Sequence, residues 1–120
     1  MARRLWRWFG VDSREELIHS GATLVNIAWY KGKKGKGDGY ELNEHLVTFV
    51  QITSCKYDLT FLVGKVAQEA VIGYREPKML WRFGRYAGLP HPSGINAQLN
   101  DGGDEKVRRA VRRWLRSLEL

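Results

Sequence analysis

The sequence has little of the chemistry on which secreted and metal-binding domains depend. Its 120 residues include one cysteine, Cys55, and three histidines, His19, His45 and His91. A single cysteine cannot form an internal disulfide, and these four residues lack the close paired spacings of a zinc site. We therefore expect no metal, no cofactor and a reducing, intracellular environment. Cys55 is predicted to be a small apolar residue at the end of a strand.

Long apolar runs are also missing. No stretch approaches the roughly 18 consecutive apolar residues of a membrane-spanning helix. Residues 1–10 are basic and aromatic, but Arg7 interrupts the apolar stretch and Gly10 ends it, which does not fit a secretory signal. We expect a chain that is not secreted, has no transmembrane segment and lies in the cytoplasm or in a nucleoprotein particle.

What the chain does contain is positive charge and enough apolar material for a core. Lys and Arg number 20 against 13 Asp and Glu, so the formal net charge is +7, and 43% of the residues are hydrophobic. The length predicts one domain, residues 1–120. Within it, residues 1–10 are interpreted as a basic N-terminal arm and residues 31–39, rich in Lys and Gly, as a flexible loop.

The hydrophobic periodicity predicts an α+β fold with a small, mainly antiparallel sheet covered by helices. Ser13 and Glu16 have the spacing of a capping box, so a short helix is expected to begin there and to end at Gly21. Residues 22–30 alternate as a half-buried strand does, and residues 46–54 are rich in Val, Thr, Phe and Ile. The sequence therefore predicts two strands joined by the Lys-Gly loop.

Two later segments leave helix and strand both open. Residues 58–74 favour a helix that begins at Asp58 and ends at Gly73, and the alternative is two strands, 59–63 and 70–74. Residues 77–87 favour a helix that begins at a proline and is stopped by Gly88, with a strand over 79–83 as the alternative.

The clearest expected element is an amphipathic, arginine-rich helix at the C-terminus. From Asp104 onward apolar residues recur at helical spacing, and basic residues occupy the other directions. The expected packing stripe is Val107, Ala110, Val111, Trp114, Leu115 and Leu118.

Clustered arginines on a fixed helix are typical of proteins that bind phosphate polymers, because several contacts on one face release several counterions. A merely solvated face usually mixes charges of both signs, whereas residues 108–116 contain no acid. Lys78, Arg82 and Arg85 would also share one face if residues 77–87 were helical. The candidate nucleic-acid-binding residues are Lys33, Lys34, Lys36, Lys78, Arg82, Arg85, Arg108, Arg109, Arg112, Arg113 and Arg116.

Aromatic residues beside these cations are candidates for stacking on bases. They are Tyr30, Tyr40, Trp81 and Tyr86. Trp29, Phe49 and Trp114 are instead predicted to lie in the core, and Trp81 has a core role as its alternative.

The N-terminal arm has two interpretations of its own. Trp and Arg together favour a membrane interface, with Arg3, Arg4, Trp6, Arg7 and Trp8 as the candidate contacts. Alternatively, Leu5, Trp8 and Phe9 pack onto the domain.

No catalytic motif is found. Glu41, Glu44 and His45 lie close in sequence, but nothing pairs a nucleophile with an oriented base. The sequence therefore predicts a non-catalytic protein that binds the backbone of RNA or DNA within a nucleoprotein assembly. The alternatives are a peripheral membrane, matrix-type or virion structural adaptor, and a module that docks on an acidic protein.

Overall fold

Short helices and strands alternate along the chain. The computed structural model describes residues 2–26, 28–30, 40–73, 80–92 and 102–118, and these include five α-helices and five strands. The α+β class is therefore confirmed. The chain forms two compact units: Met1–Leu24 together with Leu89–Leu120, and Val25–Gly88. The expectation of a single domain stays a prediction.

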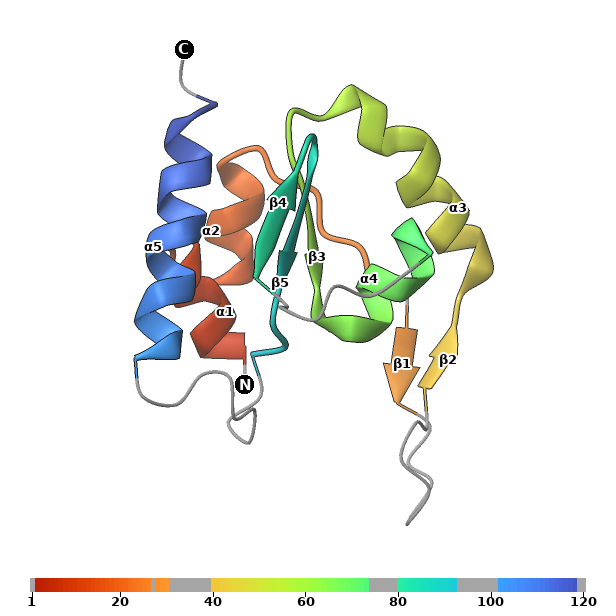
Figure 1. Cartoon of the computed structure of the whole chain (residues 1–120), viewed down its shortest axis with the longest axis horizontal. Coiled ribbons are helices and arrows are strands. Elements are labelled where there is room, and N and C mark those ends of the chain that lie inside the picture. The colour runs from red at the N-terminus through yellow and green to blue at the C-terminus, as the bar shows by residue number, and fades with distance from the viewer. Residues whose placement is uncertain (1, 27, 31–39, 74–79, 93–101, 119–120) are drawn as a thin grey trace. The chain divides into compact units, whose positions relative to one another are not determined.

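The first unit is helical and joins the two ends of the chain. It contains α1 (Ala2–Trp8), α2 (Arg14–His19) and α5 (Gly103–Arg116). Helices α1 and α5 lie against each other, the red and blue ribbons of Figure 1. Its buried apolar side chains are Trp8, Leu17, Leu89, Val107, Ala110 and Val111. The predicted C-terminal helix and the burial of Val107, Ala110 and Val111 are confirmed, whereas Leu118 lies beyond the end of the helix and is 37% exposed. Trp114 and Leu115 are half-buried.

The ends of α2 agree with the capping pattern in its sequence. The Ser13 hydroxyl accepts a hydrogen bond from the amide of Glu16 at 3.1 Å, and the Glu16 carboxylate accepts one from the amide of Asp12 at 2.9 Å. Gly21 has a φ of 104°, and its amide donates to the carbonyl of Ile18. A left-handed residue at this position satisfies the last carbonyls of the helix, so the predicted boundaries of α2 are confirmed.

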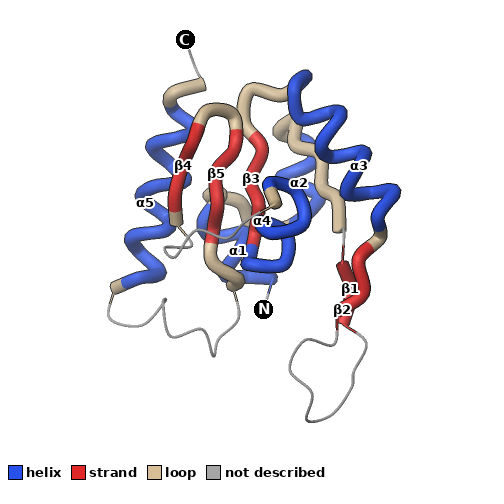
Figure 2. Tube along the Cα trace, turned by 45° about the vertical axis from the view of Figure 1, so that its right-hand side comes forward, coloured by secondary structure: helices blue, strands red, loops and turns tan. Residues whose placement is uncertain are grey.

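The second unit holds the strands. Strand β1 (Ala28–Tyr30) pairs antiparallel with β2 (Tyr40–Leu42) in a two-stranded sheet. Strands β3 (Thr60–Val63), β5 (Tyr86–Leu89) and β4 (Trp81–Phe83) form a three-stranded mixed sheet in that order, as Figure 2 shows. The β4–β5 pair is an antiparallel hairpin.

Two helices pack around the core of this unit, α3 (Glu44–Thr53) and α4 (Gly64–Ile72). Its centre is Val47, Leu62 and Val71, one residue each from α3, β3 and α4. The partly buried side chains around them are Val25, Leu46, Val50, Ala67, Ala70, Ile72, Trp81 and Tyr86.

The strand predicted over residues 46–54 is wrong, because this segment forms α3 and the start of a short 3₁₀ helix (Ser54–Lys56). Its β-branched residues favour a strand locally. The Asn43 side chain overrides that preference, since it accepts a hydrogen bond from the amide of Leu46 at 3.2 Å and caps the helix. Helical spacing also places Val47 and Val50 together on the core.

The strand predicted over residues 22–30 is shorter than expected. Among its described residues only Ala28–Tyr30 is a strand, and it belongs to the two-stranded sheet. The expected joining loop, residues 31–39, lies outside the described residues.

In residues 58–74 the structure combines the two alternatives. A strand occupies Thr60–Val63, and a helix then runs to Ile72 with Gly73 as its left-handed cap, at a φ of 84°. The predicted start at Asp58 and the alternative strand over 70–74 are wrong. Gly64, with a φ of 86°, makes the sharp passage from strand to helix.

The helix predicted over residues 77–87 is also wrong where it is described. Its alternative, a strand over 79–83, overlaps β4, and Gly88 lies within β5 instead of stopping a helix. Gly84, with a φ of 62°, starts the two-residue turn between the strands.

Candidate nucleic-acid interface

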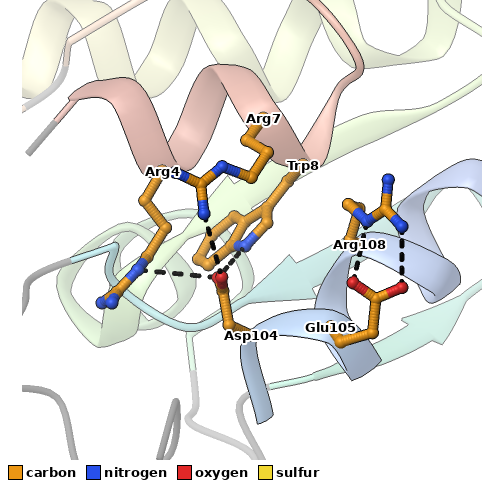
Figure 3. A network of polar contacts seen from close by, with 6 residues as sticks. All are labelled: Arg4, Arg7, Trp8, Asp104, Glu105 and Arg108. Atoms are coloured by element: carbon orange, nitrogen blue, oxygen red, sulfur yellow. Dashed lines mark hydrogen bonds and ion pairs between the residues drawn. The ribbon is translucent and has the colours of Figure 1, made fainter. Parts of the chain in front are cut away.

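Helix α5 is attached to α1 through Asp104, a residue of its first turn. The indole Nε1 of Trp8 donates a hydrogen bond of 2.6 Å to Asp104 Oδ1. Arg4 Nε lies 3.5 Å from the same oxygen and Arg7 Nη1 lies 3.7 Å from Oδ2, so three side chains of α1 converge on one carboxylate (Figure 3). Trp8 is only 1% exposed. The contact therefore fixes α5 against α1.

Helix α1 ends in a tight turn that is held by backbone hydrogen bonds. The amide of Val11 donates to the carbonyl of Trp6 at 3.0 Å, and the amide of Gly10 donates to that of Arg7 at 3.1 Å. With a φ of 73° at Gly10, this is a helix end of the Schellman type. It turns the chain sharply just after Phe9.

Glu105 neutralises part of the arginine face. Its carboxylate accepts two hydrogen bonds from Arg108, at 2.9 and 2.8 Å (Figure 3). It also lies 3.5 Å from Arg109 Nε. The hydrogen bond from Arg108 holds the pKa of Glu105 below its ordinary value, and the same bond raises the pKa of Arg108. This pairing is complete at neutral pH and is lost only as acid protonates Glu105.

The rest of the face carries charge that this acid does not reach. Arg112, Arg113 and Arg116 are exposed, and in the described part of the chain no acidic group lies within ion-pair distance of them. Arg109, which Glu105 does approach, still has 79% of its side chain accessible. Helical spacing arranges these residues as two pairs one turn apart, Arg109 with Arg113 and Arg112 with Arg116.

A hollow of about 250 Å³ lies where the end of α1 meets α5. The lining residues are Trp8, Phe9, Gly10, Arg112, Leu115 and Arg116. It thus combines an apolar wall with two guanidinium groups.

Comparison with protein-family models, curated proteins and solved structures finds no match. Among the described residues, no three His, Cys, Asp or Glu side chains come together as metal ligands would, and no helix is long and apolar enough to cross a membrane.

The other predicted cations do not belong to α5. Lys33, Lys34, Lys36 and Lys78 lie outside the described residues. Arg82 belongs to β4 and Arg85 to the hairpin turn, so the expected shared helix face with Lys78 does not form. Arg82 Nε donates to the carbonyl of Gly84 at 3.4 Å, and Arg85 donates to the carbonyl of Cys55.

The described candidates for stacking are used by the second unit's own packing. Trp81 Nε1 donates to Oε1 of the fully buried Gln68 at 2.9 Å. A Cβ at Gly88 would lie 2.2 Å from Trp81 Nε1, so only glycine fits beneath this ring. The Tyr86 hydroxyl hydrogen-bonds Ser54 Oγ at 2.6 Å. The other two candidates, Tyr30 and Tyr40, pair in the β1–β2 register, and their side chains lie outside the description.

Some expectations about burial are also corrected. Phe49, predicted to be core, is 46% exposed, because it lies on the side of α3 away from Val47. Trp114 is half-buried. Cys55 is exposed and belongs to the 3₁₀ helix, not to a strand.

In the N-terminal arm, the packing interpretation agrees with the burial of Trp8, whose indole is removed from any exposed surface. Arg4 and Arg7 contact Asp104, whereas Arg3 is exposed and Trp6 half-buried.

Two residues of the candidate site, Glu105 and Phe9, are not among the binding residues predicted from the sequence. Glu105 limits the free charge of α5, and Phe9 lines the hollow. The spacing of Glu105 to Arg108 and Arg109, three and four residues, is a signal that could have revealed the first. Phe9 has no such signal, since its neighbours on α5 are about a hundred residues away in sequence.

Proposed function

We propose that this protein binds the phosphate backbone of RNA or DNA, without catalysis, as part of a nucleoprotein assembly. The contacts come from the exposed arginines of α5, which are Arg109, Arg112, Arg113 and Arg116. Lys33, Lys34, Lys36, Lys78, Arg82, Arg85 and Arg108 remain candidates for additional contacts.

One observation supports the proposal most strongly: the arginine face belongs to a helix whose position is fixed by its packing. The opposite side of α5 is buried through Val107, Ala110 and Val111, and its first turn is held through Asp104. A cationic face with a fixed position loses little conformational entropy when it binds an extended anion. Arginine also offers bidentate contacts to phosphate.

The membrane alternative draws on the N-terminal arm, and the burial of Trp8 weakens it. The ring of Trp8, one of the two tryptophans that would sit at headgroup depth, is bonded to Asp104, so its contact with lipid would require α1 to leave α5. An acidic protein partner would use the same arginines as nucleic acid.

The test is a titration of the full chain into a labelled, mixed-sequence oligonucleotide at several salt concentrations, followed by fluorescence anisotropy. With about four or more phosphate contacts, the plot of log K against log salt should have a slope near −4 or steeper. Replacing Arg109 and Arg113 together by alanine should flatten the slope by about two units and weaken all sequences equally.

The matched control replaces Arg14 and Lys56 by alanine, which removes the same charge from exposed positions on α2 and on the 3₁₀ helix. It should leave the slope nearly unchanged. An affinity that is weaker than about 100 μM and insensitive to salt would overturn the proposal. Equal losses in the two double variants would show that net charge, not the face of α5, determines binding.

A further inference from the structure

We infer that the hollow between the end of α1 and α5 receives one unpaired nucleotide of a single strand. Its phosphate would lie on Arg112 and Arg116, and its base against Phe9 and Leu115. The inference rests on the proposed function and adds to it a preference for single-stranded over duplex nucleic acid.

The positions of the lining residues support separate contacts for the phosphate and for the base. Arg112 and Arg116 stand one helical turn apart on the same side of α5, and Leu115 precedes the second of them. Phe9 and Gly10 come from the end of α1. The charged groups of the hollow, Arg112 and Arg116, thus belong to α5, and the ring of Phe9 comes from the end of α1. A nucleotide likewise has a charged phosphate at one side and an aromatic base at the other.

The volume sets the size of the occupant. About 250 Å³ lies below the range of roughly 300–1,000 Å³ found for pockets that hold drug-sized ligands. One nucleotide is of this order, whereas the acyl chains of a lipid are not. Phe9, Gly10 and Leu115 also offer apolar surface that a bare phosphate would leave unused.

The expected preference for single strands over duplexes follows from whether the base of the nucleotide is accessible. In a duplex each base is stacked and paired, so only the phosphates can reach Arg112 and Arg116. In a single strand the base can leave its neighbours and stack on an aromatic side chain. The aromatic ring of Phe9 should therefore matter for single strands alone.

The experiment compares a labelled single strand of about 12 nucleotides with a labelled hairpin duplex of similar charge, using the full chain. Two variants, Phe9→Ala and Phe9→Leu, remove the ring, and the second keeps most of its apolar volume. Each should weaken single-strand binding about five-fold or more while leaving hairpin binding and the salt slope unchanged.

Phe83→Ala is the matched control, because Phe83 is an aromatic residue that is 80% exposed on the hairpin of the second unit. It should leave binding of the single strand unchanged. Circular dichroism and thermal melting establish that each variant is folded, and Phe9→Leu keeps the test decisive if the alanine variant is not.

The outcomes separate this inference from the proposed function. If both ligands bind with steep salt dependence but Phe9→Leu affects neither, or affects both equally, the inference is overturned and the function stands. If neither ligand binds, the function itself fails. Binding of anionic phosphatidylserine vesicles, or of a poly-glutamate peptide, that depends on Phe9 while the single strand does not bind would overturn the inference as well.

Discussion

Glu105 determines how much of the positive charge on α5 is available to a ligand. It is the acid that faces the arginine side, and its two oxygens are occupied by Arg108 and approached by Arg109. The hydrogen bond from Arg108 keeps the pKa of Glu105 below its ordinary value, so the carboxylate is ionised at neutral pH. A single carboxylate therefore keeps one arginine, and part of a second, from acting as free cations.

Glu105→Gln should tighten nucleic-acid binding. The change keeps a polar side chain of the same length but removes the charge, so Arg108 and Arg109 become free to contact phosphate. We expect an affinity about three- to ten-fold higher at about 50 mM salt and a steeper salt slope, measured by the same anisotropy titration.

Glu44→Gln serves as the comparison, since it removes one exposed negative charge at the start of α3. An equal gain from both substitutions would mean that net charge alone is responsible. If Glu105→Gln does not raise the affinity for nucleic acid, Arg108 and Arg109 do not contact phosphate.

At the scale of the element, the stability of α1 depends on α5. Helix α1 has seven residues, and isolated helices shorter than about 12–15 residues are marginal in water. Trp8 and two arginines of α1 contact Asp104 of α5. The Schellman end stops α1 directly after this tryptophan. The wall of the hollow exists only while this contact is made.

Asp104→Ala should lower the free energy of unfolding by about 1–3 kcal/mol, because the buried indole N–H of Trp8 loses its acceptor. Urea unfolding followed by circular dichroism measures the change. Asp58→Ala, which removes an exposed carboxylate from a loop, should cost less than about 0.5 kcal/mol. Equal midpoints for the two variants would contradict a structural role for Asp104.

Which elements could be predicted from the sequence depends on whether their determinants are local. Helix α2 has its cap at Ser13 and its stop at Gly21, and α5 has a long amphipathic stripe, so both were predicted. Helix α3 was missed because its β-branched residues outweighed a single cap at Asn43. The β4–β5 hairpin was missed because Gly84 and Gly88 resemble helix stops until Trp81 is seen to cover Gly88.

The candidate site divides in the same way. The arginine face of α5 follows from local periodicity, so it was predicted. The Asp104 contacts and the hollow join residues from opposite ends of the chain, and no pattern within one segment encodes them.

At the scale of the whole molecule, the net charge of +7 generates a general attraction for polyanions, and the arginine face of α5 is the proposed binding location. A ligand that binds only the folded state stabilises that state in proportion to the logarithm of its concentration. The protein should therefore melt at a higher temperature when nucleic acid is present.

A single-stranded oligonucleotide at about 100 times its Kd should raise the midpoint of thermal unfolding by roughly 5–15 °C at low salt. The shift should vanish at about 0.5 M salt, where the phosphate contacts weaken. Differential scanning fluorimetry measures it, with an uncharged polymer such as dextran as the comparison. A shift of the same size with dextran, or one that persists in high salt, would contradict phosphate binding.

The pairing of Trp8 with Asp104 joins residues that are 96 positions apart. During synthesis on a ribosome, residues 25–88 emerge with all the strands and helices of the second unit before Asp104 exists. Helix α1 is too short to persist alone, so it becomes ordered only once α5 has been made. Until then Trp8 is exposed, and any nascent chain that stops before residue 104 would carry an uncovered tryptophan for chaperones and proteases to find.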